Sequence, residues 1–293
     1  MNNYQKKWVY LLVLSLIWGS SFILIKKGLI GLTALQMGAL RVIITGLILI
    51  GVGFKSLKTI EKKNYKWIVA TGVLGTFFPA FLFAFAETEV DSAIASILNS
   101  LVPLNTVLFG LAIFKITTTK RQVTGVIIGL IGTMILIASG AHLNPHQNYL
   151  YAGLVIIATI MYAMSVNIIK KHLHNETPLA IASGNFVAII IPAFVILFFS
   201  DFFSHSTFNR EGFYISIYYI VLLSIFGTAI AKVLFNKLVH ISSPVFASSV
   251  AYVMPLVAVL WGVLDGEKIS FIQALGGVII LIGVYLVNKK SKA

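Results

Sequence analysis

Two charged side chains lie inside long apolar runs of the sequence. Arg41 falls in the run 33–53 and Lys232 in the run 214–236. Both side chains can bind a carboxylate, and buried charges of this kind are candidates for function. Lys232 has an alternative, because its side chain can extend to a nearby polar boundary. Asn236 stands one turn further along the same face, so Lys232 and Asn236 could instead face the cytoplasmic mouth of a cavity and bind a ligand there; the sequence leaves both possibilities open. For Arg41 we expect a structural bridge to backbone carbonyls.

A stripe of small and polar residues follows one helical face in each of two apolar runs. The stripes consist of Ser92, Ser96, Asn99, Pro103, Thr106 and Gly110, and of Pro244, Ser248, Ala251, Pro255, Ala258 and Gly262. Prolines in mid-helix release carbonyls, which a polar cavity can satisfy, whereas small residues also allow plain helix packing. The stripes therefore predict either a cavity wall, with Asn99 and Ser248 as binding residues and Pro103 and Pro255 as hinges, or packing alone.

Aromatic and hydroxyl residues form a further candidate wall. Trp18 and Ser21 stand at the same spacing as Tyr162 and Ser165. These four residues could line a binding cavity. The alternative is a set of buried aromatics whose N–H or O–H groups bond across helices. Further binding candidates of the same kind are Phe78 and Tyr252.

The composition defines the elements that must position these residues. The chain has 293 residues, of which 58% are hydrophobic and 11% charged, and it has no cysteine. Soluble domains are about one quarter charged, so the chain is predicted to be an integral membrane protein. Ten continuous apolar runs predict ten transmembrane helices, not barrel strands. The runs are 8–25, 33–53, 67–86, 92–114, 122–139, 150–169, 178–199, 214–236, 243–264 and 270–288.

The net charge of +13 is best interpreted as an orientation signal. With the N-terminus inside, 16 of the 22 lysines and arginines fall in cytoplasmic loops, four outside and two within spans. This bias predicts a multi-pass protein of the plasma (inner) membrane with both termini cytoplasmic. The expected partners are a small-molecule substrate and anionic lipids at the cytoplasmic face, with no nucleic acid. The short loops are compatible with a monomer.

The chain repeats itself. An offset of 144 aligns Trp18 with Tyr162 and Ser21 with Ser165, and an offset of 152 aligns Pro103 with Pro255. We therefore expect a first five-helix repeat at 1–141, a connecting loop at 142–149 and a second repeat at 150–293. Five is an odd number, so the repeats should be inverted with respect to each other. Inverted repeats around a central cavity are typical of secondary transporters.

Several motifs resemble the drug/metabolite transporter superfamily, in particular its EamA-type ten-helix members. They are Ile17-Trp18-Gly19-Ser20-Ser21-Phe22, Leu40-Arg41, Ala95-Ser96-Ile97-Leu98-Asn99-Ser100-Leu101-Val102-Pro103 and Gly266-Glu267-Lys268-Ile269-Ser270. The resemblance implies a basket whose third, fourth, eighth and ninth helices, with parts of the first and sixth, line a cavity. It also implies export or exchange of small metabolites, often amino acids, across a bacterial inner membrane. Phe114-Lys115 replaces the Gly-Glu turn of the family after the fourth helix, which leaves that acid's role to Glu267 alone.

No carboxylate lies well inside any span, and no nucleotide-binding or hydrolytic motif is present. We therefore expect no cofactor, no metal and no enzymatic activity. Transport should proceed by facilitated diffusion or exchange, or by proton coupling through Lys232 or acids at the span ends. The sequence favours outward movement of an amino acid or a related compound by alternating access. Alternatives are a multidrug or lipid-linked sugar exporter or flippase and, from another class, a membrane-embedded enzyme.

Overall fold

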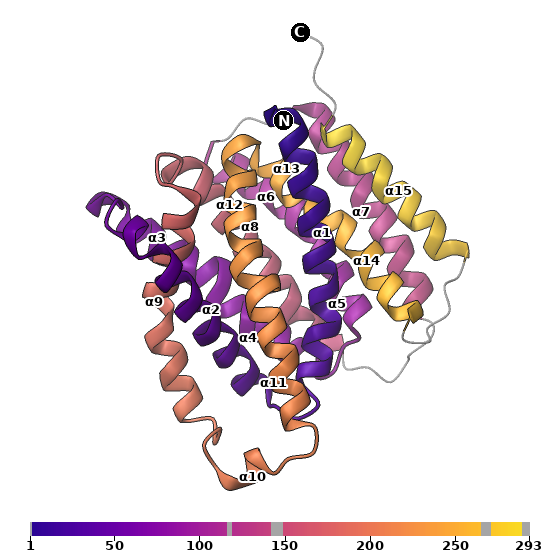
Figure 1. Ribbon diagram of the computed structural model, residues 1–293. Helices are drawn as coiled ribbons and strands as arrows, with labels where there is room; N and C mark the ends of the chain where they lie inside the picture. Colours follow the sequence, from indigo (N-terminus) through magenta and orange to yellow (C-terminus); the bar gives the residue numbers. More distant parts are fainter. Residues whose placement is uncertain (1, 116–118, 142–148, 265–270, 289–293) are drawn as a thin grey trace.

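The computed structural model describes residues 2–115, 119–141, 149–264 and 271–288, and within these ranges it contains helices and no strand (Figure 1). The first half of the chain forms α1 (Asn3–Gly28), α2 (Ala34–Leu57), η1 (Lys62–Asn64), α3 (Tyr65–Gly72), η2 (Val73–Phe77), α4 (Phe78–Ala86), α5 (Ser92–Leu98), η3 (Asn99–Leu101), α6 (Val102–Ala112) and α7 (Lys120–Ala141). The second half forms η4 (Tyr149–Tyr151), α8 (Ala152–His172), α9 (Pro178–Phe198), α10 (His205–Phe208), α11 (Phe213–Leu222), η5 (Leu223–Ile230), α12 (Ala231–Ile241), α13 (Pro244–Ser248), α14 (Val250–Leu264) and α15 (Phe271–Asn288).

Each of the ten predicted spans corresponds to a helix or to a run of consecutive helical segments. Eight of these are long and apolar enough to cross a membrane when only described residues are considered. The other two spans are α7 and α15, which pack side by side along their length (Figure 1). The start of α1 and the end of α15 lie at one end of the bundle, and α10 lies at the other. The prediction of an all-helical membrane protein is confirmed.

Equivalent helices of the two halves begin in the same way. Thr33 precedes α2 and its side chain accepts a hydrogen bond from the backbone N–H of Gln36. Thr177 precedes α9 and accepts in the same way from Ala180. A threonine in this position satisfies a backbone donor that would otherwise lack a partner at the helix start. The repeat seen in the sequence therefore specifies equivalent local structure.

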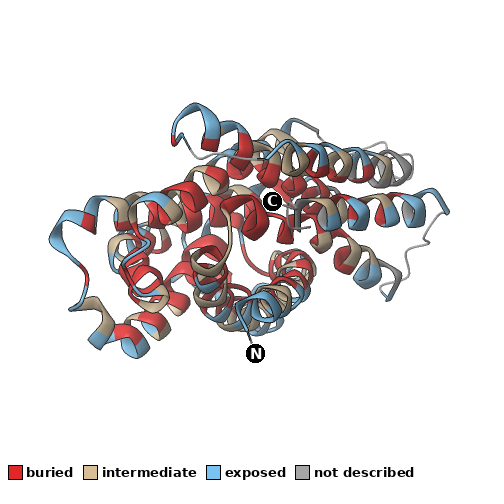
Figure 2. Cartoon of the chain, turned by 90° about the horizontal axis from the view of Figure 1, so that it is seen from above, coloured by how far each residue is buried: buried red, intermediate tan, exposed pale blue. Residues whose placement is uncertain are grey.

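The packing of the helices also repeats. α1 packs against α14 and, in the same way, α8 packs against α6, while α2 packs against its equivalent α9. Buried residues lie on the inward faces of the helices, and exposed residues, many of them apolar, cover the outside (Figure 2). Glycines allow the closest approach between α7 and α15, because a Cβ on Gly283 would lie 2.6 Å from the backbone nitrogen of Gly129. The inversion of the repeats follows from their odd number of spans and stays a prediction.

Four of the spans are interrupted, and these interruptions shape the interior. The third span contains the π-helical segment η2 and the eighth contains the π-helical segment η5. The fourth contains the 3₁₀ segment η3, and the ninth is divided between α13 and α14. A π segment shifts the backbone hydrogen-bond register and is frequent at functional sites. The interrupted spans are the third, fourth, eighth and ninth, the four that the family resemblance places around a cavity.

Candidate functional site

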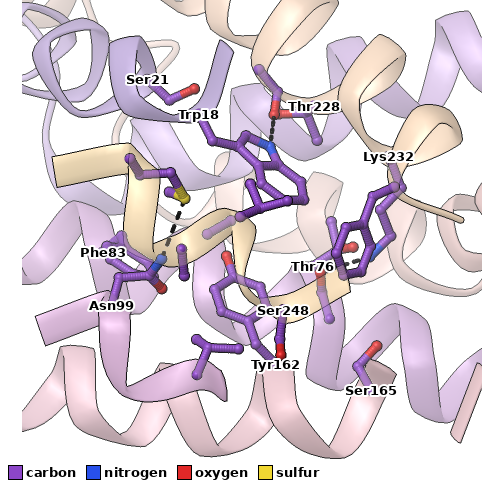
Figure 3. A pocket seen from close by; sticks show the side chains of 18 of the residues that line it. Trp18, Ser21, Thr76, Phe83, Asn99, Tyr162, Ser165, Thr228, Lys232 and Ser248 are labelled. Atoms are coloured by element: carbon purple, nitrogen blue, oxygen red, sulfur yellow. Dashed lines mark hydrogen bonds between the residues drawn. The ribbon is translucent and has the colours of Figure 1, made fainter. Parts of the chain in front are cut away.

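A cavity lies at the centre of the bundle (Figure 3). Its walls come from both halves of the chain, including α1, η2, α4, α8, η5, α12, α13 and α14. The residues that line it are Trp18, Ser21, Phe22, Ile25, Arg41, Gly75, Thr76, Ala80, Phe83, Asn99, Val102, Tyr162, Ser165, Val166, Gly227, Thr228, Lys232, Phe235, Ala247, Ser248, Val250, Ala251 and Met254. Seven of the ten predicted binding residues are among them, and so is Arg41.

Lys232 lies inside the bundle and does not extend to the boundary of the membrane. Its side chain is 7% exposed, and its Nζ donates a hydrogen bond of 2.7 Å to the backbone carbonyl of Gly75. Pro79 stands four residues after Gly75 and has no N–H, so it cannot donate to that carbonyl as a helix residue normally would. A lysine from the second half thus bonds to a carbonyl of the first half that lacks its ordinary i+4 donor.

Arg41 also lines the cavity, and it bonds differently from our expectation. Its Nε donates to the Thr228 hydroxyl at 2.9 Å instead of to a backbone carbonyl. Thr228 in turn donates to the carbonyl of Leu223, five residues earlier in the π segment η5. The side chain extends from α2 as far as the cavity, so its partner is a hydroxyl of the second half and not a backbone carbonyl, and the structural role of Arg41 stays a prediction.

Trp18 combines the two roles that the sequence left open. It lines the cavity, and its Nε1 donates across helices to the carbonyl of Gly227 at 2.9 Å (Figure 3). Its ring also packs against Phe235 at 5.2 Å between centroids. Tyr162, at the equivalent position of the second repeat, stacks on Phe83 at 6.1 Å. The Tyr162 hydroxyl has no hydrogen-bond partner among the described residues, so it remains available to a ligand.

Serine and asparagine side chains complete the polar part of the wall. The hydroxyls of Ser21 and Ser248 each donate to a carbonyl of their own helix, at 2.9 and 3.1 Å. The Ser165 hydroxyl lies 3.5 Å from the carbonyl of Thr71 on the neighbouring helix. Asn99 contacts the sulfur of Met254 through Nδ2, and its buried Oδ1 has no partner within the described part of the chain. Unpartnered buried acceptors are uncommon, and a substrate donor would satisfy this one.

Three predicted binding residues lie outside the cavity wall. Phe78 is 45% exposed on the outer surface, because it stands about half a turn from the cavity-facing residue Thr76. Asn236 is fully buried and donates to the carbonyl of Pro178, since α12 packs against the start of α9 at this level. Tyr252 is also fully buried, and its hydroxyl donates to the carbonyl of Val126. For Asn236 and Tyr252 the structure supports a packing role, and Phe78 lies on the outer surface of the bundle.

The two predicted hinge prolines are buried and stand beside the cavity wall without forming part of it. Pro103 is the second residue of α6, which directly follows η3, and the carbonyl of Asn99, four residues before Pro103, accepts from the Val102 N–H in a tighter turn. Pro255 lies inside α14, and the carbonyl four residues earlier accepts from the Ser100 hydroxyl at 2.9 Å. Both freed carbonyls therefore have partners, and the hinge role stays a prediction.

The sequence reasoning missed several wall residues in the interrupted spans. Thr76 and Thr228 line the cavity, as do the glycines that precede them. The signal was available, because Gly75-Thr76 and Gly227-Thr228 align at the same offset of 152 as the prolines. The aromatic residues Phe83 and Phe235 were also missed, and nothing in the apolar pattern of their helices distinguishes them.

One buried acidic residue of the described chain lies near Arg41. Glu87 follows the last residue of α4 and is buried; its Oε2 accepts from the Ser92 hydroxyl at 2.9 Å, while Oε1 has no partner in the described chain. Burial raises the pKa of Glu87 well above its ordinary value, against smaller lowering effects of Ser92, Arg41 and Lys26. The carboxyl thus favours its neutral form. Glu267 falls outside the described residues, as does most of the predicted loop 142–149.

The fold and the cavity together define the class of the protein. It is a multi-pass membrane protein whose interrupted helices enclose a largely apolar cavity with several polar side chains, at the junction of two sequence repeats, which is the arrangement of a membrane transporter.

The comparison with known proteins agrees. The sequence matches the EamA-like transporter family twice, over residues 6–138 and 150–289, and the chain belongs to this family.

Similar proteins carry transporter descriptions. The chain is 29% identical, over 95% of its length and 89% of the relative's, to YedA of Escherichia coli K12, described as an uncharacterized inner membrane transporter. It is 24% identical to an uncharacterized transporter of Archaeoglobus fulgidus, with 98% of this chain and 100% of that protein covered. It is 23% identical, over 96% and 94%, to a probable amino-acid metabolite efflux pump of Escherichia coli K12. A solved structure described as "Crystal structure of protein" has the same fold, with a TM-score of 0.72, 16% identity and coverage of 95% and 94%.

Proposed function

We propose that the protein is a secondary transporter that moves a small metabolite, an amino acid or a related compound, outward across a bacterial inner membrane by alternating access. The observation that carries this proposal is the central cavity, whose polar side chains come from both repeats. In transporters built from repeats, relative movement of the halves exposes such a site to each side in turn. The description of one relative as a probable amino-acid metabolite efflux pump supports the substrate and the direction.

The size of the cavity supports a small substrate. The volume of the cavity that the centre of a water molecule can occupy is about 120 Å³. One water needs roughly 10–15 Å³ on this scale, so the space corresponds to about ten waters. A compound of about ten non-hydrogen atoms fits this space. A lipid-linked sugar or a large drug would need a much wider opening between the helices.

Unpartnered polar groups in the wall support recognition of a polar substrate. The Thr76 Oγ1 and Asn99 Oδ1 atoms are buried and have no hydrogen-bond partner among the described residues. Aromatic rings of Trp18, Phe83 and Tyr162 lie beside them (Figure 3). This combination of apolar surface with a few convergent polar groups is typical of small-molecule sites.

Substrate protection of single cysteines tests the proposal directly. Because the chain has no cysteine, each introduced thiol is the only one present. Ser165→Cys and Ser248→Cys place a thiol in the cavity wall with little change in volume, and Ser206→Cys places one on an exposed loop as the matched control. The ligands are the twenty common amino acids, screened first by thermal shift and then by counterflow in proteoliposomes.

We expect a stabilising amino acid to slow labelling of the two cavity cysteines by a methanethiosulfonate reagent and to leave the loop cysteine unaffected. Counterflow of the same compound should be seen with the wild-type protein. The proposal fails if proteoliposomes show no counterflow of any amino acid or related small organic acid, or if a transported compound protects neither cavity position.

The proposed orientation has its own test. We propose that both ends of the chain face the cytoplasm, which the concentration of basic residues in alternate loops supports. Ser206 in α10 and Thr59 after α2 are both exposed and belong to loops on opposite sides in this arrangement. In intact cells, an impermeant thiol reagent should label Ser206→Cys and spare Thr59→Cys, and the reverse result contradicts the orientation.

A further inference from the structure

We infer that the substrate of this cavity is a small organic acid with net negative charge, whose acid group binds to Arg41 and Lys232. The inference rests on the proposed transport function and deepens it by naming the substrate class. It separates this class from neutral zwitterions, to which most common amino acids belong, and from cations.

The two basic side chains retain most of their hydrogen-bonding capacity. An ammonium group has three donors and a guanidinium group has five. Lys232 uses one donor, on the carbonyl of Gly75, and Arg41 uses one, on the Thr228 hydroxyl. Neither forms a salt bridge with a described residue. Both side chains line the same cavity, so their remaining donors are available to a ligand there.

The wall offers no opposite charge to balance these two. None of the described residues that line the cavity is an aspartate or a glutamate. The nearby Glu87 lies outside the wall and bonds to Ser92, and its raised pKa favours the uncharged acid. Charges within a membrane are normally paired with each other or with backbone carbonyls. Two cations without a fixed counter-ion therefore favour a ligand that brings the negative charge.

The same wall is unfavourable to a positively charged ligand group. An ammonium group of a substrate would find neutral acceptors, such as the Asn99 and Thr76 oxygens, while two cations raise the electrostatic potential of the cavity. A zwitterion can place its carboxylate at Lys232, but its ammonium group gains only neutral acceptors and is repelled by the two cations. A second carboxylate in place of the ammonium group gains a contact instead.

A charge series of nearly equal size tests the inference. Glutarate has two carboxylates and no ammonium, glutamate adds the ammonium, and glutamine replaces one carboxylate by an amide. Binding is measured by thermal shift of the purified protein and transport by counterflow in proteoliposomes. We expect affinity to fall in the order glutarate, glutamate, glutamine, with a difference of about tenfold or more between the first and the last.

Variants connect the charge preference to the two residues. Lys232→Met and Arg41→Gln should each weaken glutarate binding about tenfold or more and change glutamine binding far less. Arg41→Lys keeps the charge and should keep the order of the series, even where Arg41→Gln does not fold. Lys237→Met, at an exposed position on the same helix, is the matched control and should leave both affinities unchanged.

The outcomes distinguish the inference from the proposed function. Counterflow of glutamine or another neutral amino acid that equals or exceeds counterflow of glutarate overturns the inference and leaves the transporter in place. An unchanged preference for glutarate in both Lys232→Met and Arg41→Gln also overturns it. Absence of any response to the series and to the twenty amino acids contradicts both the inference and the proposed function.

Discussion

The two π-helical segments, η2 in the first repeat and η5 in the second, have equivalent sequences and different partners. The carbonyl of Gly75 accepts from Lys232, whereas the carbonyl of Gly227 accepts from Trp18. The position equivalent to Lys232 is Ala80, which cannot reach a carbonyl across the cavity. Duplication thus explains the scaffold that the two halves share. The groups that define the cavity's chemistry arise where the repeats have diverged.

The threonines that follow these glycines show the same divergence. Thr228 accepts from Arg41, while the buried Thr76 hydroxyl has no partner in the described chain. The position equivalent to Arg41 is Asn185, whose shorter amide bonds to Thr71 at 3.0 Å. The second repeat therefore provides a hydroxyl that is satisfied by a cation from the first, and the first repeat provides a hydroxyl that a ligand can use.

The equivalent threonines give the largest expected contrast in stability. Thr228→Val removes the acceptor for the buried guanidinium of Arg41 and should lower the free energy of unfolding by about 1.5–3 kcal/mol. Thr76→Val removes a hydroxyl without a partner and should leave the stability unchanged or slightly higher. Chemical denaturation in mixed micelles measures both. Equal losses for the two variants would show that Thr76 has a partner, and that this contrast between the repeats is wrong.

The equivalent aromatics give the next contrast. Trp18→Phe leaves the Gly227 carbonyl without its donor and should cost about 1–2 kcal/mol of stability. Tyr162→Phe removes a hydroxyl that bonds to no described residue and should change the stability by less than about 0.5 kcal/mol. The same denaturation experiment measures these changes. If Tyr162→Phe destabilises as much as Trp18→Phe, its hydroxyl is structural and is not available to a substrate.

The two interrupted proline helices allow a double-mutant test. Pro103 frees the carbonyl of Asn99, which accepts from a backbone N–H in a tight turn. Pro255 frees the carbonyl of Ala251, which accepts from the Ser100 hydroxyl. Ser100→Ala should cost about 1 kcal/mol. Pro255→Ala restores an N–H that can bond to Ala251, so the double variant should recover most of this loss. Additive effects of the two substitutions would contradict this account.

Most of the fold was predictable from the sequence because hydrocarbon allows few structures. Each span needs a long apolar run, and such runs end at clear polar boundaries, as the agreement of α2 and α9 with 33–53 and 178–199 illustrates. The breaks within spans were harder to place. Pro103 follows one of them closely, but Pro255 lies inside α14 and not at the break before it, and no composition signal marks a π segment such as η5. Only the repeated Gly-Thr pair pointed to it.

The site was predictable in part, for a physical reason. Trp18, Ser21 and their equivalents were found because polar or aromatic residues at repeated positions stand out against an apolar background. Phe78 and Tyr252 were misplaced because helical phase changes at each interruption, so the face of a residue beyond a π segment cannot be extrapolated. The partners of Arg41 and Lys232 lie 187 and 157 residues away, and such contacts cannot be read from local patterns.

The smallest expected effect concerns the ends of two equivalent helices. Lys170 belongs to α8. Its Nζ donates to three backbone carbonyls at the end of α12, among them that of Val239, at 2.6–3.3 Å. The end of α4 has Glu87 at the position of Val239, and Lys26, the equivalent of Lys170, is exposed. One end is therefore held by a lysine, and the other contains a buried acid that titrates.

Glu87→Gln should change how stability depends on pH. Burial raises the pKa of Glu87 above its ordinary value of 4.5. The contribution of this carboxyl to the stability of the fold is therefore fully present below pH 4.5, and it is lost as the pH rises through the raised pKa. The variant should therefore gain melting temperature over wild type at pH 8 and gain little at pH 5. Glu89→Gln, at the exposed position two residues on, should show no such difference. If Glu87→Gln raises the melting temperature equally at pH 5 and pH 8, the Glu87 carboxyl does not titrate in this range. The ends of α4 and α12 would then not differ in their response to pH.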